Sequence, residues 1–349
     1  MNLESLVRKI ATPLAAALAV EIVGVVFLMV GILPKEAAFF LAGILAFFVI
    51  FAPLKSAVLF AVFSIPLYTA LPITESFDSM ASWRIIVAIL FLRVLLRSPW
   101  AGKYPRIPLT RLSIVVGLFF IFGALSLLVA REPMFGVKKL AYLANIFSLF
   151  FVIQATIKNK DDFIAVLKYA LGGFIVTLAA GYAQFTAVLF APLYSFWLWW
   201  AAHVIPVFYG ADLGRLLTHA NTWFSYYKNG EPTLRIFSVF PDSHSFALYM
   251  VLILPILSIF LLKFKRAPSR ALGGTLFNIS ALAGIAVLVL LAIIFSGTRG
   301  VWIGAVPSFL FVLISFLFLK LHVKKIERIV KILRETRERF ATVLYIGLV

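Results

Sequence analysis

The chain has 349 residues, of which 63% are hydrophobic and only 13% are charged, and it carries a formal net charge of +18 and no cysteine. A soluble domain is nearer to half apolar and a quarter charged, so this composition excludes an ordinary soluble protein and indicates a polytopic membrane protein. The lack of cysteine excludes disulfides and cysteine-ligated metals. Because positive charge orients a membrane protein in its bilayer, we do not expect nucleic acid as a partner.

Apolar runs that approach the thickness of a bilayer follow one another from Ile10 onward. Lipid offers no partner to backbone N–H and C=O groups, so each run should be an α-helix. The expected spans are residues 10–33, 37–53, 56–73, 81–97, 112–130, 139–157, 163–190, 244–263, 273–296 and 301–320. The sequence therefore predicts an all-α membrane protein with about ten to eleven transmembrane helices, which form a single transmembrane domain over residues 1–349.

The chain ends inside a further apolar run that begins near Ala341. Nine residues are too short to cross about 30 Å of hydrocarbon. We therefore expect the domain to be incomplete at its C-terminus.

The distribution of lysine and arginine predicts a cytoplasmic N-terminus. With this orientation 23 of the 32 basic residues lie on the inner side, eight of them between Lys320 and Arg339. Such an excess is typical of cytoplasmic loops. The segment 321–340 has the pattern of a basic amphipathic helix, which would either lie on the inner leaflet or simply connect two spans.

The stretch 191–210, APLYSFWLWWAAHVIPVFYG, is apolar enough to be mistaken for a span. If it crossed the membrane, the two most basic stretches that follow would move outside, against the charge rule. Tryptophan and tyrosine favour the head-group level, so we expect this stretch to lie in the outer interface. It then opens a long outer loop over residues 191–243.

Polar residues gather at the outer mouth of the span 244–263, in the sequence RIFSVFPDSHS from Arg235 onward. Helix capping explains Asp242 and Ser243, because both side chains accept hydrogen bonds from the first N–H groups of a helix. Capping does not explain Arg235 or His244. Neutral imidazole titrates near working pH, so His244 is a candidate catalytic base, as are His203 and His219 on the same side.

A second outer cluster, FSGTRG, contains Arg299 at the end of the span 273–296. Arg299 could reach the phosphates of the outer leaflet as an ordinary interfacial arginine. Alternatively, Arg235 and Arg299 together could grip a diphosphate, since guanidinium groups bind phosphate oxygens in pairs.

Aromatic residues are frequent in the outer loop, including Trp223, Tyr226 and Tyr227. An aromatic belt at the interface accounts for them, and stacking on sugar rings is the alternative. The sequence holds no cluster of Asp, Glu, His or Cys at metal-ligand spacing, so we expect neither a metal nor another cofactor. Glu21 lies within the first span, where an acidic residue is usually paired or functional.

The two stretches RIFSVFPDSHSFALYMVLILPI and IIFSGTRGVWIGAV resemble the O-antigen ligase and O-antigen polymerase superfamily of bacterial envelope glycosyltransferases. The resemblance covers roughly residues 235–309. It implies a multi-pass protein of the bacterial cytoplasmic membrane that takes an undecaprenyl-diphosphate-linked glycan as donor and a lipid or glycan as acceptor. It also implies that Arg235 and Arg299 hold the diphosphate without a metal ion, and that an outer-face base, here His244 or a residue beyond Val349, activates the acceptor.

Two other classes of function remain open. A transporter or flippase of an anionic lipid or solute would also need arginines at the outer face, although the expected spans are apolar through their middles apart from Glu21 and Gln154. A non-catalytic assembly partner is the third reading. The choice between ligase and polymerase stays open as well.

The predicted orientation can be tested by labelling, because the chain has no cysteine of its own. A cysteine introduced at Asn229 should react with a membrane-impermeant thiol reagent in intact cells, and one introduced at Ser269 should react only after lysis. The reverse pattern would contradict the orientation.

Overall fold

The computed structural model describes residues 13–73, 80–96, 110–219, 223–226, 230–266, 279–307 and 310. By their contacts, the residues form two compact units. The first comprises Met1–Ala247 and Phe295–Gly297, and the second comprises Leu248–Ile294 and Thr298–Val349. Each unit is described by itself.

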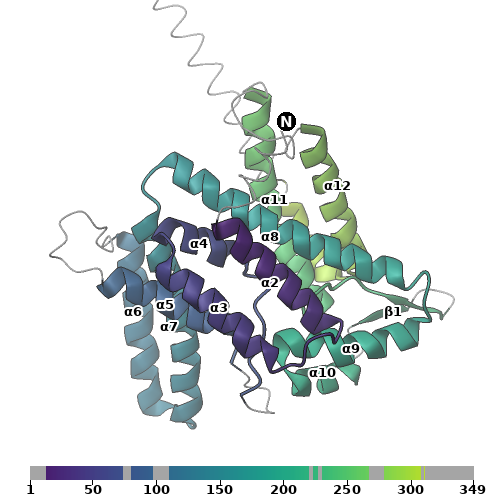
Figure 1. The fold of residues 1–349 in the computed structure, drawn as a ribbon, viewed down its shortest axis with the longest axis horizontal. Coiled ribbons are helices and arrows are strands. Elements are labelled where there is room, and N and C mark those ends of the chain that lie inside the picture. Colours follow the sequence, from purple (N-terminus) through teal and green to yellow (C-terminus); the bar gives the residue numbers. More distant parts are fainter. Residues whose placement is uncertain are drawn as a thin grey trace, which may run out of the picture. The chain divides into compact units, whose positions relative to one another are not determined.

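The described residues are mostly helical, with one two-stranded sheet among them (Figure 1). The helices are α2 (Pro13–Met29), α3 (Ala37–Phe51), α4 (Leu54–Phe63), α5 (Ser82–Leu96), α6 (Arg111–Ser126), the 3₁₀ turn η2 (Leu127–Val129), α7 (Pro133–Thr156), α8 (Lys160–Ala187), α9 (Leu193–Tyr209), α10 (Ala211–Thr218), α11 (Ser243–Arg266) and α12 (Ile279–Phe295). The strands are β1 (Phe224–Tyr226) and β2 (Pro232–Leu234). The predicted basic helix 321–340 lies outside the described residues.

Four helical segments of the described chain are long and apolar enough to cross a membrane, namely Arg111–Val129, Pro133–Thr156, Lys160–Ala187 and Ser243–Phe260. Shorter apolar helices occur at Pro13–Met29, Ala37–Phe51, Leu54–Phe63 and Ala281–Phe295. These helices indicate a membrane protein. The predicted count of ten to eleven spans is not confirmed, and the cytoplasmic N-terminus stays a prediction.

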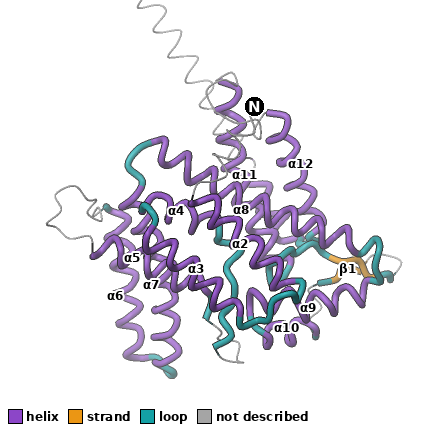
Figure 2. The backbone as a smooth tube through the Cα atoms, in the orientation of Figure 1, coloured by secondary structure: helices purple, strands orange, loops and turns teal. Residues whose placement is uncertain are grey.

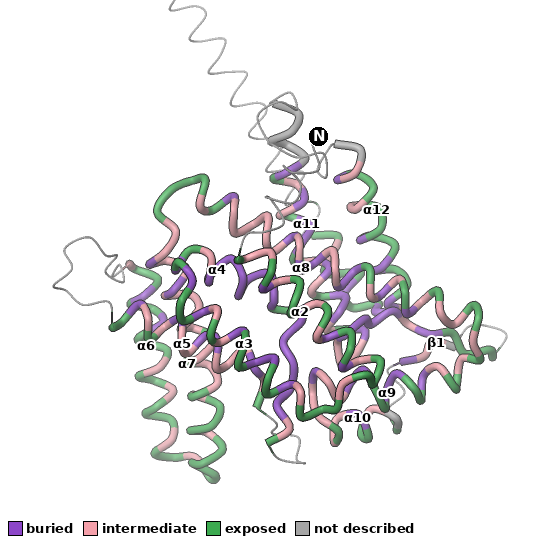
Figure 3. Tube along the Cα trace, viewed as in Figure 1, coloured by how far each residue is buried: buried purple, intermediate pink, exposed green. Residues whose placement is uncertain are grey.

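Most residues of the hairpin formed by α6 and α7 are exposed or half-buried (Figure 3). Phe122, Leu128 and Phe135 are exposed there, with Leu128 at 82% of its full accessible surface. A water-soluble protein would not leave so large an apolar surface uncovered, whereas acyl chains cover it in a bilayer.

The predicted span 56–73 is not one helix. The helix α4 ends at Phe63, and the chain then runs without helical structure to Ile73. Pro66 explains the break, because proline cannot continue the hydrogen-bond ladder and also disfavours helical geometry at the residue before it. A ten-residue helix is only about 15 Å long, which is half of a bilayer core.

The segment that follows α4 is buried almost throughout: Ser64, Pro66 and the residues from Leu67 to Leu71 are all covered by protein (Figure 3). Its backbone finds partners in other segments. The N–H of Ala70 donates to the carbonyl of Val207 in α9 at 2.7 Å, and the N–H of Leu71 donates to Met80 at 2.8 Å. Non-helical backbone at membrane depth is tolerated where protein encloses it in this way.

The helix α8 covers one side of the interrupted span 56–73 by packing directly against α4. Two adjacent glycines allow the approach. A Cβ atom added to Gly173 would overlap the carbonyl oxygen of Phe63, and one added to Gly172 would lie 2.9 Å from the Phe63 ring. The last turn of α4 therefore occupies the space that a side chain at position 172 or 173 of α8 would need.

Loops that were predicted to share a side of the membrane meet in the first unit. On the predicted inner side, Lys55 forms an ion pair with Asp162, and Arg93 donates to the carbonyl of Ala52 at 2.9 Å. On the predicted outer side, the loop 31–36, the segment 70–73 and the helices α9 and α10 line one pocket. The contacts agree with the predicted division of these loops between two faces.

The second unit contains most of α11, which has Pro255 in its interior, and most of α12. After α12 the chain turns at Thr298 and begins a helix over residues 299–307. The backbone N–H groups of Val301 and Trp302 donate to the carbonyl of Thr298, and the Trp302 indole donates to the carbonyl of Ile293 at 2.8 Å. These bonds fix the turn that carries Arg299.

Substituting Gly173 with alanine should destabilise the protein by about 1–3 kcal/mol, because the added methyl group meets backbone that cannot rotate away. Thermal unfolding in detergent measures the change. Gly117→Ala in α6 is the matched control, since a Cβ atom there meets nothing within 4 Å. Equal melting temperatures for the two variants would contradict the tight packing of α8 on α4.

Candidate functional site

Arg235 follows directly after β2, the second strand of the small sheet within residues 191–243. Figure 2 shows this sheet in orange. The strands β1 and β2 pair antiparallel, with Phe224 opposite Leu234 and Ser225 opposite Thr233. The N–H of Arg235 donates to the carbonyl of Trp223 at 2.9 Å, so the pairing continues by one residue past β2. This extension holds the Arg235 backbone in a defined position.

The Arg235 side chain lies between Ser225 and Gly297. Its Nε donates to the Ser225 hydroxyl at 2.9 Å. Gly297 has a φ of +65°, and a Cβ atom there would lie 2.7 Å from Ser225 Oγ and 3.2 Å from Arg235 Nε. Glycine is thus required at position 297 both for its left-handed backbone and for the space that the guanidinium occupies. The two motifs that carry the family resemblance meet at this point, although they are about 60 residues apart in the sequence.

The segment after Arg235 is held against α8 by buried hydrogen bonds. The side-chain oxygen of Gln184 accepts from the N–H groups of Phe237 and Ser238 at 3.1 and 3.0 Å, and Ser238 Oγ donates to the carbonyl of Thr177 at 2.7 Å. Ser238 has a φ of 54°, an uncommon conformation for a residue with a side chain. Gly181 gives the segment room to approach, since a Cβ atom there would lie 3.0 Å from Ile236.

Trp223 is fully buried and belongs to the core of the outer loop. Its ring packs against Phe237 at a centroid distance of 4.3 Å and against Trp197 at 6.0 Å. It therefore has no exposed face on which a sugar could stack, which corrects its predicted role as a glycan contact. Tyr226 ends β1, while Tyr227 lies outside the described residues, and their contact with a glycan stays a prediction.

Asp242 caps α11, as expected. Its Oδ1 accepts from the N–H groups of His244 and Ser245 at 2.8 and 2.9 Å, and its Oδ2 accepts from the Ser245 hydroxyl at 2.8 Å. The His244 side chain is 55% exposed, with Nδ1 3.6 Å from Asp242 Oδ1. Burial raises the pKa of the Tyr209 hydroxyl, and the negative charge of Asp242 raises it further. The hydroxyl therefore stays protonated and can donate a hydrogen bond.

Arg299 lies in the second unit, as the exposed first residue of the helix 299–307. The N–H groups at a helix N-terminus carry partial positive charge, which disfavours a cation and favours an anion. Arg299 is thus a poor residue for this position unless its guanidinium faces a negative group. Its predicted approach to Arg235 stays a prediction.

Glu21 is 1% exposed and accepts a hydrogen bond from the Ser64 hydroxyl at the end of α4. Its second oxygen, Oε1, has no partner among the described residues. The buried acid therefore sits at the break in the interrupted span. The sequence indicates a buried acid at Glu21, whereas its position beside a broken helix depends on the tertiary structure.

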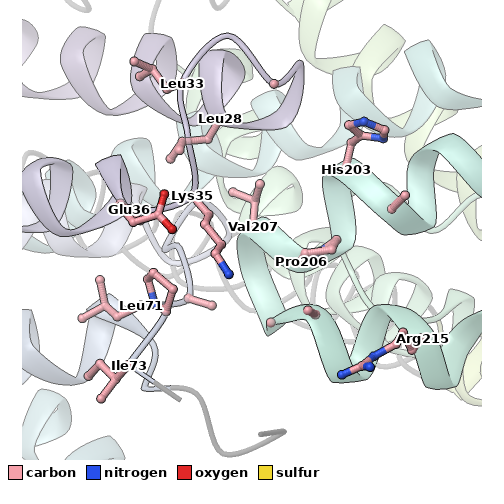
Figure 4. A pocket seen from close by; sticks show the side chains of 17 residues that line it. Leu28, Leu33, Lys35, Glu36, Leu71, Ile73, His203, Pro206, Val207 and Arg215 are labelled. Atoms are coloured by element: carbon pink, nitrogen blue, oxygen red, sulfur yellow. The ribbon is translucent and has the colours of Figure 1, made fainter. Parts of the chain in front are cut away.

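A pocket of about 770 Å³ opens in the first unit between the α2–α3 loop, the segment 70–73 and the helices α9 and α10 (Figure 4). His203 contributes to its lining. The His203 ring stacks on Trp199, and its Nδ1 lies 3.0 Å from the Trp199 carbonyl oxygen. Donation from Nδ1 to this carbonyl leaves Nε2 as the basic nitrogen.

Two residues that organise the Arg235 region, Gln184 and Thr177, lie in the span 163–190, for which the sequence predicts an apolar middle. A polar side chain within a span is rare, so Gln184 itself was the signal that could have been used. Gln154, which was noticed, has a different role: it ties α7 to the cap of α6 through Thr110 and Ser113.

Comparison with known protein families, curated proteins and solved structures finds no match to this chain.

Replacing Gln184 with leucine should destabilise the protein by about 2 kcal/mol or more, because two buried N–H groups would lose their acceptor. Thermal unfolding measures the loss, and limited proteolysis within residues 235–242 shows whether it is local. Gln154→Leu is the control, because its two bonds are long, at 3.3 and 3.4 Å, and only partly buried. If both variants unfold alike, Gln184 does not hold the Arg235 segment.

Proposed function

We propose that the protein transfers or polymerises a polyprenyl-diphosphate-linked glycan at the outer face of the bacterial cytoplasmic membrane. The main supporting observation is the position of the Arg235 side chain, which is oriented by the Ser225 hydroxyl and lies against Gly297. This arrangement supports the proposal because it brings together the two motifs that resemble the O-antigen ligase and polymerase superfamily.

Charge stabilisation is the main requirement of this reaction. When the glycosidic bond to the diphosphate breaks, negative charge develops on the departing oxygen, and oriented positive groups lower the barrier most. Arg235 has its Nε on Ser225, so its two terminal nitrogens are directed as a pair and suit bidentate binding. In the proposed mechanism Arg299 adds a second guanidinium and the N-terminal N–H groups of its helix.

The acceptor hydroxyl needs a base that removes its proton as the new glycosidic bond forms. His244 is the candidate base, and its exposure leaves the ring accessible to an acceptor. Tyr226 and Tyr227 are proposed to orient the glycan. Trp223 is assigned a structural role, because it supports the backbone that carries Arg235.

Transport of an anionic lipid or solute is the second candidate, and one observation favours it. Transporters commonly place a broken helix and a buried acid near the middle of the membrane. The end of α4 beside Glu21 has this character. The predicted span 56–73 is helical only up to Phe63, so the first unit contains a broken helix of the kind that transporters use.

Replacing Arg235 or Arg299 with lysine should lower glycan transfer about tenfold or more, because lysine keeps the charge but loses the planar pair of donors. The assay uses membranes that contain the protein, prepared from a strain that lacks its own enzyme, and a polyprenyl-diphosphate oligosaccharide donor. A chelator should leave transfer unchanged, since arginine meets the charge on the diphosphate.

Arg131→Lys is the matched control, since this arginine is also predicted on the outer side and is exposed at the start of α7. Full activity of both arginine variants, or complete loss of transfer with chelator, would contradict the proposed mechanism. Absent transfer together with a substrate flux in proteoliposomes that Glu21→Gln abolishes would instead support transport.

A further inference from the structure

The outer pocket has an apolar wall and a charged mouth. Leu28, Leu33, Leu71, Ile73 and Val207 supply much of the wall, whereas Lys35, Glu36 and Arg215 supply the charges (Figure 4). All of these residues lie within the first unit. A cavity that is apolar on one side and charged on the other suits a ligand of the same character, and the head group of a membrane lipid with the first carbons of its chains is such a ligand.

Two positive side chains reach the pocket from different elements. Lys35 comes from the loop between α2 and α3, and its amine has no side-chain partner among the described residues. Arg215 comes from α10, where it forms an ion pair with Asp212. A guanidinium has five N–H donors in a planar fork, so an arginine can contact a carboxylate and a phosphate at the same time.

The position of Arg215 follows from the tight hairpin of α9 and α10. Gly210 turns the chain with a φ of +85°, and a Cβ atom on Gly214 would lie 2.9 Å from the carbonyl oxygen of Ala201. Glycine at both positions lets α10 fold back against α9. The hairpin therefore presents Arg215 on the pocket side.

The pocket is also lined by residues that carry hydrogen-bond acceptors, namely Glu36 with its carboxylate and Ala202 with its carbonyl. Glu36 lines the pocket and forms no ion pair with another described residue. Pro206 in α9 has no N–H group and cannot bond to the carbonyl of Ala202, which also lines the pocket. A ligand with only negative charge would meet Glu36 unfavourably, whereas a ligand with a phosphate and an ammonium group matches both signs.

We propose that this pocket binds the head group of an aminophospholipid, with the phosphate at Lys35 and Arg215 and the ammonium group at Glu36. The apolar wall then covers the first methylene groups of the lipid chains. The site is separate from Arg235 and does not depend on glycan transfer, so it can be tested whether or not the protein is a transferase.

Native mass spectrometry of the full chain, released from detergent with defined lipids, measures this binding. The probes are phosphatidylethanolamine, phosphatidylglycerol and the soluble head group glycerophosphoethanolamine. We expect the chain to retain phosphatidylethanolamine in preference to phosphatidylglycerol, and to bind the soluble head group far more weakly because it lacks chains. Lys35→Ala and Arg215→Ala should each weaken retention of both lipids about fivefold, the ratio that corresponds to one basic residue near a lipid phosphate.

Glu36→Gln gives the sharper result, because it should abolish the preference for phosphatidylethanolamine while phosphatidylglycerol is still retained. Arg131→Ala is the control, an exposed arginine on the same predicted side that does not line the pocket. The three pocket side chains are exposed, so all variants should keep the melting temperature of the parent protein. The proposal is overturned if Lys35→Ala binds lipid like Arg131→Ala, if Glu36→Gln keeps the preference, or if the soluble head group binds as tightly as the lipid.

Discussion

The contact between Gly173 of α8 and the carbonyl of Phe63 at the end of α4 is the constraint on which the first unit depends. A crossing that stops being helical halfway leaves backbone groups that lipid cannot satisfy, so protein must enclose it on every side. The glycine pair of α8 brings a rigid helix close enough to do so. The segment from Ser64 to Leu71 can then hydrogen bond to α9 and to the residues before α5 instead of to water.

The same helix also supports the candidate site. Gly181 lies eight residues beyond Gly173, or about 12 Å along the helix, and Gln184 follows one turn later. The segment Ile236–Val239 is held against this part of α8, because the N–H groups of Phe237 and Ser238 donate to the Gln184 side chain. One helix thus holds both the interrupted crossing and the backbone next to Arg235, so a change in the packing of α8 would be felt at the site.

The charged side chains of the Arg235 site and of the pocket near Lys35 differ in how firmly the protein holds them. At Arg235 the side chain is held by a hydroxyl group and lies against a glycine, so the guanidinium is oriented before any ligand arrives. Preorganised donors of this kind suit a group whose charge increases during a reaction. In the pocket, Lys35 and Glu36 are exposed and unpaired with other described side chains, so their charges suit a ligand that is bound and not transformed.

The sequence by itself determined the helical membrane character and the cap at Asp242, and it singled out Arg235 and the glycine-containing motif around Gly297 as candidates. These properties depend on hydropathy, on the residue types that start helices, and on short motifs, all of which are local. Pro66 is a local signal for the break in 56–73, but tertiary structure alone decided that this segment is enclosed by protein, that Trp223 is core, that Gln184 supports the Arg235 segment, and that Lys35 and Arg215 share a pocket. Each of these depends on which distant residues approach one another. An apolar run reads the same in sequence whether lipid or protein surrounds it, and only the packing of α8 and α9 around the chain distinguishes the two.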